Sequence, residues 1–494
     1  MSAILVFTAV SSLQADAVQD AARRVDAGLM RDYQDAQADW EKRYNRPLPA
    51  LPGVADDAAF LRRACVGLAG RLPRAEEVRD FLADNTIGKR GRLTDALVKE
   101  PGAAEVRFRM LAEAFRVKDD AEMVAWLRQA AAEDNPLDQL IAWWVGGRQV
   151  RRRDEENPLR SAVEIASAVL GEDLYCSMCH DHPFNSHTQR ETYEFAACFA
   201  ENGTVRLPKD YRYLDGKPGE VVKPQFIRYE MQNKAQQTGD LVKWLTARSN
   251  PRFDAVAALR VWAGLFGQSP QFVDRTLGGV DAFPGWHDIH PKPLNNMTSS
   301  NCFGPPDRDL AITHWLNYLK FSEYPGAVRA MAEEFRRCGM RIGEFQRILA
   351  STNAYSRASF NFDHRWNGMG YIVPAPQVRR LPSELIWAVI SGEKDTQMPQ
   401  VPPAGHPLRL LGRGTREWED ESCTPLSHEL VRFMMNSEHI SQAAEKAGEA
   451  EAIFIDLLGR EVTQHERTVM ARAEASPQDV AWALLNSKEF MFTR

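Results

Sequence analysis

Cysteine and histidine side chains gather in one short stretch of the sequence, from Cys176 to Phe184. The stretch reads Cys-Ser-Met-Cys-His-Asp-His-Pro-Phe. Two thiols separated by two residues and followed at once by an imidazole form the pattern through which c-type haem is attached. In that pattern Cys176 and Cys179 bond the two vinyl groups of the ring, and His180 ligates the iron. The stretch therefore predicts covalently bound haem c.

The same side chains suit other kinds of site. Thiolates and imidazoles are the usual ligands of Zn²⁺, and they also bind iron without haem. This alternative metal site has four first candidates: Cys176, Cys179, His180 and His182. His187 is a further candidate ligand. A Cys-x-x-Cys pair is also typical of a redox-active dithiol or of a turn closed by a disulfide. Asp181 is a candidate for orienting an imidazole through a ring N–H group.

The start of the chain is typical of export. Ala3 to Val10 is apolar, and it is followed by a short polar stretch and then by Ala15 and Asp16. This order resembles the apolar region and the cleavage site of a secretory signal peptide, although no basic residue precedes it. Cleavage after Ala15 would start the mature chain at Asp16, in the periplasm or the cell envelope. No run reaches the length of a membrane span, so no transmembrane segment is predicted.

Composition places the chain among globular proteins. Its 494 residues carry 61 Lys and Arg against 67 Asp and Glu, for a net charge of -6, and 44% of the residues are hydrophobic. The slight acidity argues against a nucleic-acid partner, which usually requires a basic surface. Seven cysteines in 494 residues are too few for a disulfide scaffold.

Most of the chain has the periodicity of helices, and predicted helices include those at 121–132, 137–146 and 443–458. Residues 202–250 differ, because Gly, Pro and polar residues dominate there, and a short β ribbon fits this segment. The sequence thus predicts a mainly α fold with two helical domains joined by a Gly/Pro-rich connector. The predicted segments are a signal peptide at 1–15, a helical lead-in at 16–55, a domain containing the Cys–His motif at 56–205, the connector at 206–250, and a C-terminal helical domain at 251–494.

One short pattern occurs near both ends of the chain. Leu68-Ala69-Gly70-Arg71 is followed by Glu76, and Leu457-Leu458-Gly459-Arg460 is followed by Glu466. Each predicts a helix that stops at glycine, then an arginine and a new helix, which is typical of a recurrent helical hairpin. Near the second copy, Thr463-x-x-Glu466 predicts a capping box.

The sequence around the motif resembles a known family. Cys176 to Phe184, with Thr188-Gln189, Tyr193 and Ala196 to Ala200, is similar to the planctomycete cytochrome-c-like domain. The opening of that domain is resembled by Phe60-Leu61-Arg62-Arg63 and by the stretch from Leu68 to Val78. The second half resembles the partner domain of unknown function that usually follows, in these stretches: Trp244-Leu245-Thr246, Asn250-Pro251-x-Phe253, Arg260-x-Trp262, Arg379-Arg380-Leu381 and Leu484 to Phe490.

The resemblance implies an exported, mostly helical protein with two domains. It implies no reaction, because the activity of the family is not established, so whether the chain is an enzyme stays open. We expect an exported c-type haem-binding protein with an electron-transfer or redox role and a redox partner protein. The alternatives are a non-haem Zn or Fe protein that uses the same cluster, and a cell-envelope binding or scaffold protein. The sequence assigns no oligomeric state.

Overall fold

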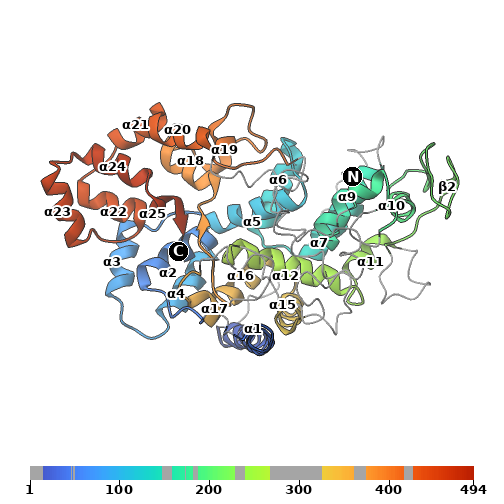
Figure 1. The fold of residues 1–494 in the computed structure, drawn as a ribbon, viewed down its shortest axis with the longest axis horizontal. Coiled ribbons are helices and arrows are strands. Elements are labelled where there is room, and N and C mark those ends of the chain that lie inside the picture. Colours follow the sequence, from blue (N-terminus) through green and yellow to red (C-terminus); the bar gives the residue numbers. More distant parts are fainter. Residues whose placement is uncertain are drawn as a thin grey trace.

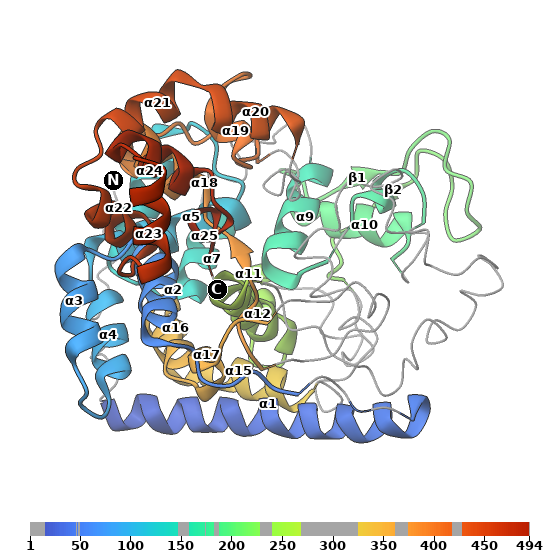
Figure 2. The same ribbon diagram turned by 60° about the vertical axis from the view of Figure 1, so that its left-hand side comes forward.

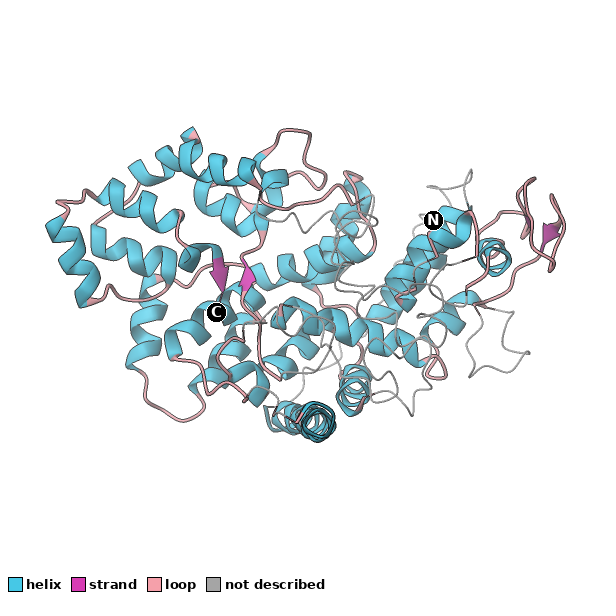
Figure 3. Cartoon of the chain, viewed as in Figure 1, coloured by secondary structure: helices cyan, strands magenta, loops and turns pink. Residues whose placement is uncertain are grey.

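The computed structural model describes residues 15–45, 47, 50–146, 158–172, 174–181, 187–227, 240–267, 325–360, 374–416 and 427–493. Helices make up most of this part of the chain, and strands are few and short (Figures 1 and 3). The predicted mainly α fold is confirmed. None of the described helices is both long and apolar enough to cross a membrane.

The described helices occur in the following order along the chain. In the first half they are α1 (Ala15–Tyr44), α2 (Asp57–Ala69), α3 (Ala75–Ala83), α4 (Lys89–Leu97), α5 (Pro101–Ala114), α6 (Ala121–Ala132), α7 (Leu137–Gly146), α9 (Pro158–Ile165), η1 (Ala166–Leu170), η2 (Cys176–Met178) and α10 (Gln189–Ala196). Next come α11 (Leu241–Thr246), α12 (Pro251–Phe266), α15 (Gly326–Arg337), α16 (Ile342–Ala350) and α17 (Asn353–Ser356). The last are α18 (Ser383–Ser391), η9 (Asp395–Gln397), α19 (Pro407–Leu410), α20 (His428–Asn436), α21 (Glu438–Glu445), α22 (Ala450–Leu458), α23 (Gln464–Arg472), α24 (Pro477–Leu485) and α25 (Lys488–Met491).

The strands form two antiparallel pairs in the described ranges. β1 (Val205–Arg206) pairs with β2 (Val221–Val222), with Val205 opposite Val222. This ribbon lies at the start of the Gly/Pro-rich connector, where the sequence predicts one. β3 (Arg379–Arg380) pairs with β4 (Phe492–Thr493) and so fastens the end of the chain beside α18.

Apolar side chains form two main cores. The first contains residues of α1 to α12 together with α15, α16 and α17, so it includes residues from both sides of the predicted connector. The second is built from residues 381–491 and also receives Val66 of α2. The domain boundaries of the sequence analysis stay predictions. Residues of α12, which follows the predicted connector, pack in the first core. Helix α12 also contacts the site described below.

The long helix α1 lies along one side of the molecule, across α15, α16 and α17 (Figure 2). Its buried apolar residues recur at helical spacing: Val18, Ala21, Ala22, Val25, Leu29 and Tyr33. Two of its carboxylates accept hydrogen bonds from main-chain N–H groups at the starts of other helices. Asp32 binds Gly326 and Ala327 of α15, and Asp26 binds Asn353 and Ala354 of α17.

The pattern found near both chain ends is an internal structural repeat. Arg71 binds Glu100 through Nε at 2.8 Å and Glu77 through Nη1 at 2.7 Å. Arg460 does the same with Glu489 at 2.7 Å and Glu466 at 2.9 Å. The second set follows the first at one constant offset (460 from 71, 466 from 77 and 489 from 100). The acid equivalent to Glu466 is therefore Glu77, whereas the sequence analysis paired it with Glu76.

Candidate functional site

The Cys–His segment follows directly after a π-helical turn. Helix α9 widens into η1, which ends at Gly171 with φ 62°. Glycine adopts this left-handed conformation without the steric cost that a Cβ atom brings. The N–H of Glu172 still donates to the carbonyl of Ala166 at 3.1 Å, so the chain leaves the helix at a fixed point. The segment that carries the cysteines begins there.

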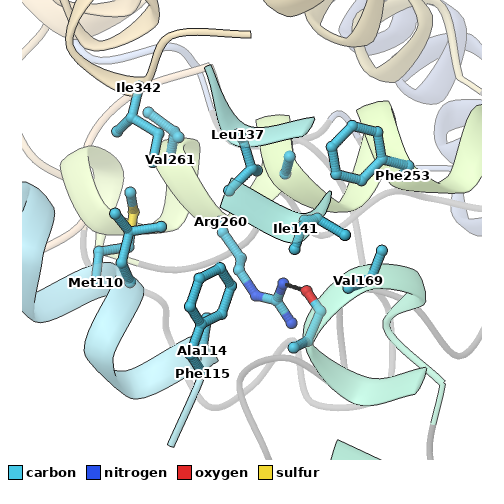
Figure 4. Close-up of a pocket in the computed structure, with 13 residues that line it drawn as sticks. Met110, Ala114, Phe115, Leu137, Ile141, Val169, Phe253, Arg260, Val261 and Ile342 are labelled. Carbon is cyan, nitrogen blue, oxygen red and sulfur yellow. Dashed lines mark hydrogen bonds between the residues drawn. The ribbon is translucent and has the colours of Figure 1, made fainter. Parts of the chain in front are cut away.

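Two arginines of α12 hold the carbonyl oxygens at the end of η1. Arg252 donates to the carbonyl of Leu170 from Nε at 3.1 Å and from Nη2 at 2.9 Å. Arg260 donates to the carbonyl of Ser167 at 2.7 Å and also to that of Ala168. Figure 4 shows Arg260 reaching from α12 to η1 along a small, mainly apolar cavity of about 30 Å³. The segment is thus anchored from α12, a helix beyond the connector.

The two cysteines lie on one helical turn. The N–H of Cys179 donates to the carbonyl of Cys176 at 3.1 Å, and the N–H of His180 donates to the same oxygen at 3.2 Å. Side chains three residues apart on a 3₁₀ turn point to the same side. Cys176 is partly buried and Cys179 is exposed, and both are thiols in the structure. Ser177 between them is fully buried, so the turn presents its cysteine side outward.

A main-chain oxygen orients His180. The Nδ1 atom of its exposed ring lies 2.7 Å from the carbonyl oxygen of Asp181. A carbonyl oxygen only accepts, so Nδ1 carries the proton and the neutral ring keeps its lone pair on Nε2. The sequence predicts that the side chain of Asp181 orients an imidazole. For His180 the main chain of Asp181 has this role, and the Asp181 carboxylate accepts the N–H of Gln189 at 2.8 Å.

The turn is held on two further sides. Helix α10 supplies Gln189, whose side-chain amide donates to the carbonyl of Met178 at 3.1 Å, and Tyr193, whose hydroxyl donates to the same oxygen at 3.4 Å. The segment between β1 and β2 supplies Tyr213, whose hydroxyl accepts the N–H of Asp181 at 2.8 Å. The β ribbon therefore helps to position the Cys–His turn.

His187 lies in a buried ionic cluster and has only 4% of its surface exposed. Its Nε2 atom is 2.9 Å from Glu172, and its Nδ1 atom is 3.1 Å from Glu191. Burial lowers the pKa of the imidazole, but the two carboxylates outweigh it and raise the pKa to about 10. As a metal ligand, His187 would have to give up one of these bonds and its proton.

The remaining predicted ligand, His182, lies outside the described residues. In the part of the chain that the structure describes, no three His, Cys, Asp or Glu side chains are arranged to hold a metal ion. Sequence reasoning missed Glu172 and Arg252, which bond to each other at 3.0 Å. They are 80 positions apart, and no local pattern links a glutamate before the cysteines to an arginine in a distant helix.

Residues 40–163 match the profile of the family PSCyt2, described as a protein of unknown function (DUF1549). The match therefore supports similarity to a planctomycete cytochrome-like domain over this part of the chain. It ends before Cys176, and the predicted partner domain in the second half has no match of this kind. No curated protein and no solved structure matches the chain.

Proposed function

We propose that this protein is an exported c-type haem-binding protein with an electron-transfer or redox role. The observation that carries the proposal is the geometry of the Cys–His turn. Cys176 and Cys179 share one side of a short helical turn, and the bond from Nδ1 of His180 to a main-chain oxygen leaves Nε2 as the atom with a lone pair. The similarity of residues 40–163 to a cytochrome-like domain agrees with this proposal.

The residues present fit a covalently attached haem. Cys176, Cys179 and His180 would hold the group, and all three are at least partly accessible to it. Tyr175 adds an aromatic side chain, 46% exposed, directly before the first cysteine. When bound, haem supplies one-electron chemistry. The chain itself holds the turn, through Gln189 and Tyr213, and fixes the tautomer of His180, the side chain that would bind the iron.

The proposal includes export to the periplasm or the cell envelope. The apolar start of the sequence supports export. Export also agrees with the haem proposal, because covalent attachment of c-type haem needs an exported chain. Cleavage after Ala15 would leave the described helix α1 whole except for its first residue. We expect the secreted protein to begin at Asp16. An intact N-terminus in protein recovered from the cytoplasm would contradict the export.

The test is the absorption spectrum of the full-length protein, exported by a host that matures c-type cytochromes. We expect a Soret band and sharp bands after reduction with dithionite, with the colour retained through acid-acetone extraction. His180→Ala should abolish the iron-linked bands. Replacing both cysteines, in Cys176→Ser/Cys179→Ser, should leave haem that acid-acetone removes, because both bonds to the ring are then lost. His465→Ala, which changes an exposed imidazole at the start of α23, is the control and should keep the spectrum.

A colourless protein from a host that loads a control cytochrome would overturn the haem proposal. Metal analysis of the same sample then tests the second candidate, a non-haem Zn or Fe site. Nε2 of His180 and the two thiols are donors of the types that such a site uses, but in the described residues they are not gathered around one point, so this site would need the turn to rearrange. If the protein also lacks metal, an envelope binding or scaffold role is left as the interpretation.

A further inference from the structure

A buried group of charges lies at the base of the Cys–His segment and takes no part in the proposed haem attachment. It consists of Glu172, His187, Glu191 and Arg252, and we call it the base cluster. The side chains of Glu172 and His187 are 0% and 4% exposed, and that of Arg252 is 3% exposed. Burial of a charged side chain costs free energy unless an oppositely charged partner lies close to it. The positions of these four side chains relative to one another therefore matter.

The pairing in the base cluster is continuous. Arg252 lies 3.0 Å from Oε1 of Glu172, whose Oε2 lies 2.9 Å from His187, which in turn lies 3.1 Å from Glu191. The two carboxylates raise the pKa of His187 to about 10, so its imidazole carries a positive charge at neutral pH. Each charged side chain in this series of contacts therefore has an oppositely charged neighbour, which compensates for its burial.

The members come from both ends of the segment that carries the cysteines. Glu172 precedes Cys176 by four residues, and Glu191 follows in the first turn of α10. His187 bonds to both, so it ties the two ends of the segment together. Arg252 then attaches that closed base to α12, because it also donates to the carbonyl of Leu170 at the end of η1.

We propose that the base cluster is a positioning device, in which the bonds of His187 to Glu172 and Glu191 hold these two residues together and so fix the orientation of the Cys–His turn between them. The biological purpose of this positioning rests on the proposed function, because the orientation of the turn matters if haem is attached to it. The closure itself is a property of the chain without any bound group, and it can be measured separately.

The test uses three variants of the full-length protein without haem. His187→Gln removes the imidazole that bonds to both the buried Glu172 and the partly buried Glu191. His187→Lys keeps a cation between them. Glu194→Gln is the matched control, because Glu194 lies on the same helix, is also buried, and pairs with Arg190 instead of a member of the base cluster. Alkylation rates of Cys176 and Cys179 are followed by mass spectrometry, together with hydrogen exchange of residues 172–181.

We expect His187→Gln to speed alkylation of the partly buried Cys176 by about fivefold or more, since a partly buried thiol reacts in proportion to the open population of its segment. Cys179 is already exposed and should change by less than about twofold. His187→Lys should return Cys176 toward the wild-type rate, and Glu194→Gln should match the wild type. If His187→Gln does not fold, Glu191→Gln removes one partner and tests the same closure.

Equal alkylation and exchange in His187→Gln and the wild type would overturn the positioning role. So would a His187→Lys variant as open as His187→Gln, because the cation would then be irrelevant. The spectrum of exported protein separates this result from the haem proposal. If the wild type is colourless and the variants follow the expected alkylation pattern, the haem proposal is rejected and the positioning role of the base cluster is supported. If the wild type is red and alkylation is the same in all variants, the haem proposal is supported and the positioning role is rejected.

Discussion

A single main-chain oxygen, that of Asp181, decides which nitrogen of His180 can act as a ligand. The hydrogen bond to it, 2.7 Å long, stabilises the tautomer that carries its proton on Nδ1. In water both nitrogens of a histidine ring are exposed to solvent, so no single partner fixes the position of the proton. The residue that the motif predicts as an axial ligand is thus prepared by its own neighbour, through the backbone and without a carboxylate.

Replacement of Asp181 by Ala separates the roles of its backbone and its side chain. The carbonyl remains, so we expect His180 in Asp181→Ala to keep the Nδ1–H tautomer at about pH 8.5, where a free imidazole is neutral. The lost bond to the N–H of Gln189 should lower the free energy of unfolding by about 1 kcal/mol. Nitrogen-15 shifts of the ring and denaturant unfolding measure the two effects. A switch to the Nε2–H tautomer would assign the orientation to the carboxylate.

Acid stability depends on a second residue, Glu384. Burial raises the pKa of this carboxyl, but Arg413 and Arg109 outweigh it and lower the pKa to about 2. Because the pKa in the folded state is below that of the unfolded chain, the stabilisation is complete above about pH 4.5 and is lost as the pH falls toward 2. Between pH 7 and pH 3, Glu384→Gln should remove about 2 kcal/mol of this pH dependence, since the folded-state pKa of about 2 leaves the rest to be lost at lower pH. Unfolding by urea at pH 7, 4 and 3 measures it, and parallel curves for both proteins would contradict the expectation.

At the scale of elements, helix periodicity and capping predict most of the described structure. Residues 121–132 and 137–146 are helices with the expected bounds, and the capping box of Thr463 and Glu466 is present. The expected helix at 443–458 is wrong, because α21 ends at Glu445 and α22 begins at Ala450. The β3–β4 pair also had no local signal, since two-residue strands so far apart in sequence show no alternation.

The internal repeat gives a prediction about one of its helix ends. Gly459 ends α22 with φ 71°, and a Cβ atom there would lie 2.7 Å from Cγ of Pro73 in the first copy. Gly392 ends α18 with a similar φ of 77° and has open space around it. We expect Gly392→Ala to cost about 1 kcal/mol and Gly459→Ala about 2 to 4 kcal/mol, because only the second adds a clash.

Thermal or urea unfolding of the two glycine variants measures the difference. Gly392→Ala is the control, because Gly392 has the same left-handed backbone conformation as Gly459 but no close neighbour. Equal losses in the two variants would mean that the contact between Gly459 and Pro73 does not bind the two copies of the repeat together.

At the scale of the whole molecule, the motif could be recognised from the sequence but its surroundings could not. Cys176, Cys179 and His180 follow from their spacing alone. Arg252 and Arg260 lie on α12, and their contact with η1 depends on packing across the predicted connector. Helix α12 belongs to the first apolar core, so the segment before the cysteines and the helix after the connector form one packed unit.

Arg62 connects the two cores. It is 5% exposed on α2, and its guanidinium donates to the carbonyls of Leu457 and Phe490 in the last part of the chain. Arg62→Ala leaves both buried oxygens without this donor and should destabilise residues 450–493 by about 2 to 4 kcal/mol. We expect faster hydrogen exchange there and unchanged exchange in α12. Arg472→Ala, on the exposed end of α23, is the control and should leave both regions unchanged.

The position of α1 has a consequence for synthesis. The ribosome makes this helix before the other described helices, and the residues that bind Asp26 and Asp32 come some 300 positions later, in α15 and α17. At about 5 to 20 residues per second, roughly 15 to 60 s pass before those partners emerge. Throughout that interval Val18, Val25 and Leu29 face water, so a chaperone that recognises an amphipathic helix has time to bind the nascent chain before it can close.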